Sequence, residues 1–139
     1  MKKSILLSVV AIAALTAACN GNKTNSAAVT DTVAVSTLSG TYEGTLPAAD
    51  CPGIETRLTI NADSTYDLTS HYIGQKDTFS VSGVYHAPDG RLVELVTPSS
   101  NEKTYYKVLD DSTLILANDK GEEPAGELRK NYQLHKKAQ

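Results

Sequence analysis

A single thiol at a predicted corner is the side chain in this sequence that is best suited to chemistry. Cys51 follows Asp50 and precedes Pro52-Gly53. A thiolate at an exposed corner could bind a soft cation, enter a mixed disulfide or sense oxidation. Zinc normally takes four donors, however, and monovalent copper usually takes at least two soft ones. Cys51 therefore predicts at most a weak metal site, and the alternative is a thiol that is buried or half-buried at the turn.

Other soft or nitrogen donors are few and scattered. The only methionine is Met1, which lies in a leader-like segment. The three histidines fall at outward positions of different predicted strands, and they are His71, His86 and His135. Such positions are typical of solvated side chains, so the sequence predicts no second ligand for the thiol within the chain.

Catalytic motifs are missing from the sequence. It contains no G-x-S-x-G, H-E-x-x-H, G-x-x-x-x-G-K-[ST] or G-x-G-x-x-G pattern. The acidic pairs Asp110-Asp111 and Glu122-Glu123 fall in predicted turns, where we expect them to face solvent. We therefore expect a protein that is not an enzyme and that holds no resident cofactor.

A second thiol, Cys19, carries a different chemistry. Lys2 and Lys3 precede an apolar run at 5–15 that is too short to span a bilayer, and two alanines stand directly before Cys19. This pattern predicts a lipoprotein signal peptide at 1–18 and lipidation of Cys19, which would anchor the protein in a membrane. The alternative is an ordinary secretory signal that is cut near Ala18.

Residues 19–37 are predicted to form the lipidated N-terminus and a flexible tether. They are rich in Ser, Thr, Asn and Ala and lack aromatic side chains, so they cannot bury enough apolar surface to offset their ordering entropy. A loose edge strand within 29–35 is the alternative. The remaining residues, 38–136, are long enough for one domain of about a hundred residues.

The charge balance excludes two classes of partner. Of 13 basic residues, 11 remain when Lys2 and Lys3 are removed, and against 16 acidic residues they leave a formal charge of −5. A mildly acidic, well-mixed surface does not predict binding to nucleic acid or anionic lipid.

With Cys19 lipidated, Cys51 is the only free thiol, so no internal disulfide can form. We expect a monomer.

Alternation of apolar and polar residues with a period of two recurs from Leu38 onward. It predicts eight strands, at Leu38–Leu46, Ile54–Ala62, Thr65–Ile73, Asp77–His86, Arg91–Thr97, Lys103–Leu109, Ser112–Ala117 and Gly126–His135. Turn residues join them, and no helical period interrupts them. The fold class is therefore all-β, a small antiparallel up-and-down barrel that is lipocalin-like and leaves no open sheet edge.

One face of each strand should supply the core. The predicted inward residues are Tyr42, Leu58, Ile60, Tyr66, Leu68, Tyr72, Phe79, Val81, Tyr85, Val93, Leu95, Tyr106, Val108, Leu114, Leu116, Tyr132 and Leu134. The aromatic residues among them could line a ligand-binding calyx or simply fill the barrel, because eight strands enclose little more than their own side chains.

The chain reverses between the first two strands. Pro47 cannot donate to a ladder, and Cys51 is pushed towards extended geometry by the proline that follows it. Pro52-Gly53 is typical of the central pair of a type II turn. The sequence therefore predicts a tight corner at 50–53 with Cys51 near its tip.

The amino-acid sequence around this corner resembles that of one family. The runs GTYEGTLP, DCPGIET and LTINADSTY are similar to the N-terminal domain of the NlpE-type envelope lipoproteins, and the resemblance extends from Leu38 to about His135. In that family the corner usually reads Cys-x-x-Cys-Pro-Gly-Ile and the hairpin Asn-Ala-Asp-Gly-Thr-Tyr. Here Ala48 stands at the first cysteine and Ser64 at the hairpin glycine.

The resemblance implies a role in copper homeostasis or envelope-stress sensing. It makes monovalent copper the expected ligand of Cys51, with binding weakened because Ala48 replaces the partner cysteine. It also makes the Asp50 to Gly53 corner the expected contact for another envelope protein. Asn20, after the lipidated cysteine, implies sorting to the outer membrane, with the domain facing the periplasm. The alternatives are a lipocalin-like binder of a small apolar ligand and a protein-binding inhibitor or adhesion module.

Overall fold

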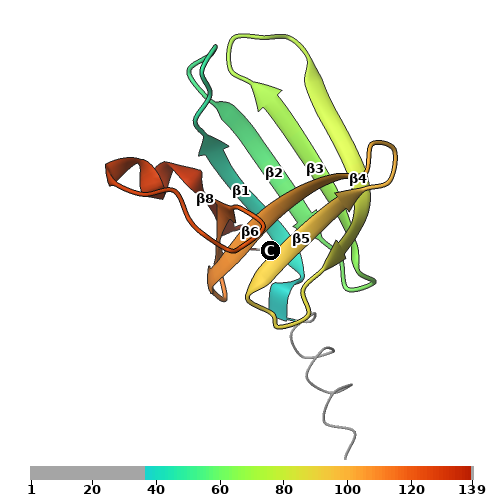
Figure 1. The fold of residues 1–139 in the computed structure, drawn as a ribbon. Helices are drawn as coiled ribbons and strands as arrows, with labels where there is room; N and C mark the ends of the chain where they lie inside the picture. Colours follow the sequence, from blue (N-terminus) through green and yellow to red (C-terminus); the bar gives the residue numbers. More distant parts are fainter. Residues whose placement is uncertain (1–36, 139) are drawn as a thin grey trace, which may run out of the picture.

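The computed structural model describes residues 37–138, which form a closed antiparallel barrel (Figure 1). Its strands follow one another around the barrel in chain order, as predicted. They are β1 Gly40–Leu46, β2 Ile54–Ile60, β3 Thr65–Tyr72, β4 Thr78–His86, β5 Leu92–Thr97, β6 Glu102–Asp110, β7 Thr113–Ala117 and β8 Gln133–Lys136. Among the described residues, no helix is long and apolar enough to cross a bilayer.

Neighbouring strands of the barrel pair over different lengths. Strands β1 to β4 pair with one another along almost their whole length, whereas β5 meets β4 only at Val84, Tyr85 and His86. In Figure 1 the strands β2 to β4, coloured green to yellow, reach higher in the view than β5 and β6. The sheet of β1 to β4 therefore extends beyond the closed part of the barrel.

A short seam between β1 and β8 closes the barrel. Only Tyr42 and Glu43 pair with β8, opposite Lys136 and His135. Beyond this seam, Gly44 lies so close to the backbone of Gln133 that a Cβ atom there would collide with its carbonyl oxygen. The absence of a side chain at Gly44 is what allows the two strands to approach.

Tyrosines fill much of the closed part of the barrel. Tyr42, Tyr66 and Tyr106 are among the largest fully buried side chains, and apolar residues pack around them: Leu38, Leu58, Ile60, Tyr85, Val93, Leu95, Leu114 and Leu134. The Tyr42 hydroxyl donates to the carbonyl of Leu38 at 2.9 Å, and that of Tyr85 donates to the carbonyl of Asn61 at 3.2 Å. These bonds offset the free-energy cost of removing the two hydroxyl groups from water.

Two predicted strands need correction. The run at 126–135 is not one strand, because a 3₁₀ helix, η1 Glu127–Tyr132, precedes β8. It follows Gly126, whose φ of 82° turns the chain. The backbone N–H of Arg129 donates to the Gly126 carbonyl at 3.2 Å. The run at 38–46 is extended only from Gly40, since Leu38 is helical and buried.

The predicted core is confirmed in the barrel but wrong at Phe79. Its side chain is 53% exposed, because β5 ends before it can cover that part of β4. Leu68, Val108 and Leu116 are partly buried and pack against the core, and Tyr72 and Tyr132 are half-buried. Inward alternation alone therefore does not guarantee burial where a neighbouring strand is short.

Ile115 is fully buried although it lies on the outward face of β7. Its cross-strand neighbour Lys107 forms an ion pair with Glu123 at 2.7 Å, and Arg129 pairs with the same carboxylate. These contacts hold the 118–132 segment against the outside of the barrel, where it can cover Ile115. Glu123 is thus half-buried and doubly paired rather than solvent-facing as predicted.

Several predictions fall on residues that are not described. The signal peptide at 1–18, the lipidation of Cys19, the position of Asn20 and nearly all of the predicted tether at 19–37 lie outside the described residues 37–138.

Candidate functional site

The corner between β1 and β2 is not the predicted type II turn. That turn requires a positive φ at its third residue, and Gly53 is not among the described glycines with positive φ, which are Gly40, Gly74, Gly90, Gly121 and Gly126. A Cβ atom at Gly53 would instead lie 2.7 Å from Cγ2 of Thr45 and 3.3 Å from the carbonyl oxygen of Leu46. Glycine is needed here because the corner folds tightly onto β1.

The carbonyl of Gly53 holds the corner in place. It accepts the backbone N–H of Ile73 at 3.0 Å and the thiol of Cys51, whose Sγ lies 3.1 Å away. The thiol is half-buried, so it is turned back towards the barrel rather than presented at the tip. Ala49, Asp50 and Pro52 are the exposed residues of the corner.

Metal-binding groups do not gather around the thiol in residues 37–138. Cys51 is the free cysteine of this region, and no group of three or more His, Cys, Asp or Glu side chains there could hold an ion. Ala48, where the resemblance implies a partner cysteine, is half-buried like Cys51. The corner can therefore supply one soft ligand, and a second would have to come from outside residues 37–138.

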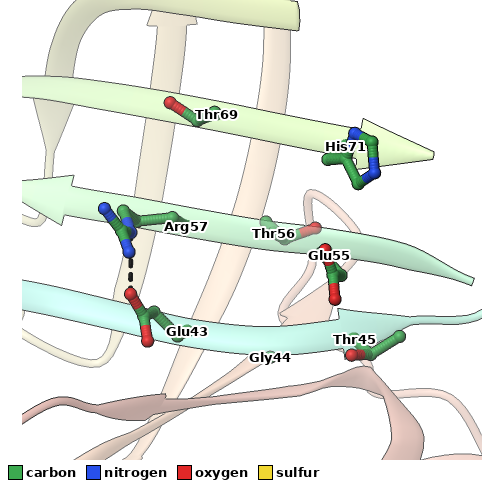
Figure 2. A pocket seen from close by; sticks show the side chains of 8 residues that line it. All are labelled: Glu43, Gly44, Thr45, Glu55, Thr56, Arg57, Thr69 and His71. Carbon is green, nitrogen blue, oxygen red and sulfur yellow. Dashed lines mark hydrogen bonds and ion pairs between the residues drawn. The ribbon is translucent and has the colours of Figure 1, made fainter. Parts of the chain in front are cut away.

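A shallow groove lies beside the corner on the outer face of the sheet (Figure 2). Its volume is about 520 Å³, and it is lined by residues of β1, β2 and β3: Glu43, Gly44, Thr45, Glu55, Thr56, Arg57, Thr69 and His71. Thr45 also contacts the corner through Gly53. The corner and the groove thus form one continuous surface, which we call the β1–β3 face.

Charges on the β1–β3 face are paired across strands. Arg57 Nε donates to Glu43 Oε1 at 2.7 Å, and Lys137 Nζ lies 3.4 Å from the other oxygen of that carboxylate. Desolvation opposes ionisation of Glu43, but the charges of Arg57 and Lys137 together outweigh it and lower its pKa. Glu43 is therefore held as a carboxylate on this face.

Histidine and glutamate meet on the same face. His71 of β3 is directly opposite Glu55 of β2, and its Nδ1 lies 3.5 Å from the Thr78 hydroxyl. As predicted, the three histidines lie on different strands, and His86 and His135 are exposed, whereas His71 is half-buried. Sequence reasoning missed this groove, since only the strand register brings Glu43, Glu55 and His71 together.

The fold and the site define a class of protein, namely a small closed β-barrel domain with a tyrosine-rich core. The distinctive polar features of this domain lie on its outer surface. Residues 42–127 match the model of the NlpE N-terminal domain. The chain belongs to the NlpE N-terminal domain family.

Two curated relatives share parts of the sequence. A 17 kDa lipoprotein of Treponema pallidum is 33% identical over 107 residues, which cover 70% of this chain and 69% of the relative. Lipoprotein NlpE of Escherichia coli is 35% identical over 78 residues, which cover 54% of this chain and 32% of the relative. The chain therefore matches about a third of the length of Escherichia coli NlpE.

Solved structures show the same fold. A lipoprotein of Shewanella oneidensis has a TM-score of 0.61 at 32% identity, and the match covers 73% of this chain and 91% of that one. Escherichia coli NlpE, described as the Cpx pathway activator, has a TM-score of 0.55 at 27% identity, and the match covers 63% of this chain and 46% of that one. The predicted barrel and the family resemblance are both confirmed.

Proposed function

We propose that this protein is a lipid-anchored component of the bacterial envelope that reports envelope stress through contact between its β1–β3 face and another envelope protein. The observation that carries the proposal is the hydrogen-bonded corner beside the open polar groove, on a barrel whose closed part is packed with its own side chains. Membership of the NlpE family and the description of one relative as a Cpx pathway activator favour this function. The proposed role is one of binding and signalling, not catalysis.

A charge reversal at the corner tests this proposal. Asp50 is exposed and forms no hydrogen bond or ion pair with the described residues, so Asp50→Arg should leave the fold intact. We expect this variant to lose most of its effect on an envelope-stress reporter in the native host. Asp119→Arg, at another exposed loop, serves as the matched control. Equal reporter responses of both variants and the wild type would contradict a role for the corner.

Copper enters this proposal only as a weak ligand. The single thiol of Cys51 donates to the carbonyl of Gly53. It offers a poor site for monovalent copper, which usually takes at least two soft donors. We therefore expect weak or no stoichiometric binding by the monomer and restored binding in Ala48→Cys, which recreates the family's cysteine pair. A competition titration with a monovalent-copper chelator on reduced wild type, Ala48→Cys and Cys51→Ser measures this. Tight binding that persists in Cys51→Ser would place the metal elsewhere.

The anchor is a separate part of the proposal. The alanines before Cys19 and the polar stretch after it support lipidation at Cys19, with Asn20 favouring the outer membrane and a domain that faces the periplasm. Cys19→Ser should block processing or release the protein from the membrane fraction. Normal maturation of this variant, together with wild-type partitioning into detergent, would show that the anchor is not at Cys19.

A further inference from the structure

Part of β4 forms a free strand edge. Residues 78–83 pair with β3 on one side, but β5 reaches only Val84, so the other side has no strand partner within residues 37–138. The Tyr85 N–H donates to the Ser64 carbonyl at 2.9 Å, on the β3 side. Because the backbone groups of a strand alternate between its two edges, those of Thr78, Ser80 and Ser82 point to the free edge.

This free edge lacks the usual protection against pairing. Exposed edges are commonly blunted by charged side chains, proline or a bulge. The free stretch reads TFSVS, with no charged residue and no proline of its own, and its pairing with β3 is regular throughout. It ends at Gly83, against which the Val96 carbonyl and Pro98 lie closely. Phe79 is 53% exposed, and its contact with Tyr72 is edge-on, with ring centroids 5.7 Å apart and planes at 86°. The edge therefore combines open hydrogen-bonding groups with an exposed apolar side chain.

We propose that the free edge of β4 binds the same edge of a second copy of this chain, antiparallel and about a twofold axis at Ser80. In this register Ser80 lies opposite Ser80 of the second copy, and Thr78 lies opposite Ser82. Each pair of outward-pointing residues exchanges two hydrogen bonds, so the three pairs form about six. The sheets of both copies then join into one sheet through β4.

Side chains support this register. On the inner face it sets Phe79 opposite Val81 of the second copy, and an aromatic residue across from a β-branched one is a favourable cross-strand pair. On the outer face it sets the Thr78 hydroxyl opposite that of Ser82, which can exchange a hydrogen bond. The exposed ring of Phe79 thereby gains the cover that β5 does not provide.

The ends of the free edge favour a second copy over a longer foreign strand. Pairing stops on one side at Val84, which is already bonded to Val96 of β5. On the other side, the exposed charges of Lys76 and Asp77 lie just beyond Thr78. The uncharged stretch between these limits is short and symmetric about Ser80, and a second β4 matches its length and chemistry.

The test uses the symmetry at Ser80. We expect the full chain in detergent to sediment as a dimer at concentrations rising to about 100 μM. In Ser80→Lys, two like charges would lie directly opposite each other, and the same holds for Ser80→Glu. Each variant alone should sediment with half the protein mass of the wild type, and an equimolar mixture of the two should recover the dimer.

A matched pair of substitutions controls for general charge effects. Asn131 is an exposed residue of η1, which leads into β8, and β8 lies four strands from β4 in either direction around the barrel, so Asn131→Lys and Asn131→Glu should both remain dimeric. A monomeric wild type at the highest concentration would overturn the proposal. It would also be overturned if the Ser80 variants remained dimeric, if their mixture failed to assemble, or if the Asn131 variants dissociated. The expectation of a monomer from the sequence makes the opposite prediction for the same measurement.

Discussion

The hydroxyl of Tyr42 lies 2.9 Å from the backbone carbonyl oxygen of Leu38, four residues earlier, and donates a hydrogen bond to it. Both residues are buried, with exposed fractions of 1% and 4%. The bond joins the segment that enters the barrel to the first strand of its core. A substitution at either residue should therefore disturb the packing of the other.

Tyr42→Phe should therefore lower the free energy of unfolding. The substitution keeps the ring but leaves the Leu38 carbonyl without this donor, at an expected cost of about 1–3 kcal/mol. Denaturant unfolding of the purified protein measures the loss. Tyr105→Phe is the control, because Tyr105 is half-exposed and has no side-chain hydrogen bond with the described residues. Equal stability of the two variants would contradict the importance of the Tyr42 bond.

Alkaline pH should destabilise the fold through its buried tyrosines. Burial, with contributions from Asp111, Tyr85 and Asp110, raises the pKa of Tyr42 from 10.0 to about 12. Burial also raises the pKa of Tyr106. Since the native state keeps these protons when the unfolded state has lost them, stability is complete below pH 10 and falls as the pH rises towards 12.

Tyrosinate absorbance should show this behaviour directly. Tyr42 and Tyr106 should ionise only above pH 10, together with the loss of the native circular dichroism signal. A single titration of all tyrosines near pH 10 with the fold intact would show that the two hydroxyls are not protected.

Ser64→Gly should stabilise the protein. Ser64 has a φ of 67°, a left-handed conformation that is costly for a residue with a Cβ atom, and the family resemblance implies a glycine at this position. Relief of this strain exceeds the entropy that glycine adds to the unfolded chain, so we expect a gain of up to about 1 kcal/mol. Thermal unfolding of the two variants and the wild type measures this gain. Ser100→Gly, at an exposed turn, should instead be neutral or slightly destabilising.

Two aromatic truncations should differ in cost. Tyr66 is 2% exposed and its hydroxyl lies 2.9 Å from that of Thr97, so Tyr66→Ala should cost about 3 kcal/mol or more through lost burial and a cavity. Phe79→Ala should cost about 1 kcal/mol or less in the monomer, because the ring is already largely exposed. Equal losses in urea unfolding at low protein concentration would mean that Phe79 is buried in solution.

Glu123→Gln should loosen the segment that covers β7. Hydrogen bonding from Lys107 lowers the pKa of Glu123, and Arg129 adds to this shift. The ionised form therefore stabilises the fold above the ordinary glutamate pKa, and this contribution is lost as the pH falls through the lowered native value. We expect faster amide exchange at Ile115 in the variant at neutral pH, and little difference from the wild type in acid. Glu127→Gln, an exposed position in η1, is the control.

Sequence periodicity predicted the strands well where neighbouring strands were long enough to bury one face. It failed at 126–135, where Leu128, Tyr132 and Leu134 keep the spacing of a strand while the backbone from Glu127 to Tyr132 is a 3₁₀ helix. Alternation reports which side a residue faces, but the length of an adjacent strand decides what covers it. That length also explains why Phe79 is exposed.

Local chemistry was a weaker guide at the candidate site. The pair Pro52-Gly53 favours a type II turn, yet the glycine is needed because Thr45 and Leu46 of the preceding strand approach it closely. The β1–β3 face could not be predicted either, because the proximity of Glu43, Arg57 and His71 depends on the register of three strands. The thiol of Cys51 was identified from the sequence, but its bond to the Gly53 carbonyl was not.

The seam between β1 and β8 sets the order in which the protein can fold. Every other pair of neighbouring strands is adjacent in sequence, whereas Glu43 and Lys137 meet across 94 residues. Contacts between distant residues form slowly, because a long loop must close before they bring any gain. Local hairpins should thus form first, and the barrel should become complete only when β8 pairs with β1.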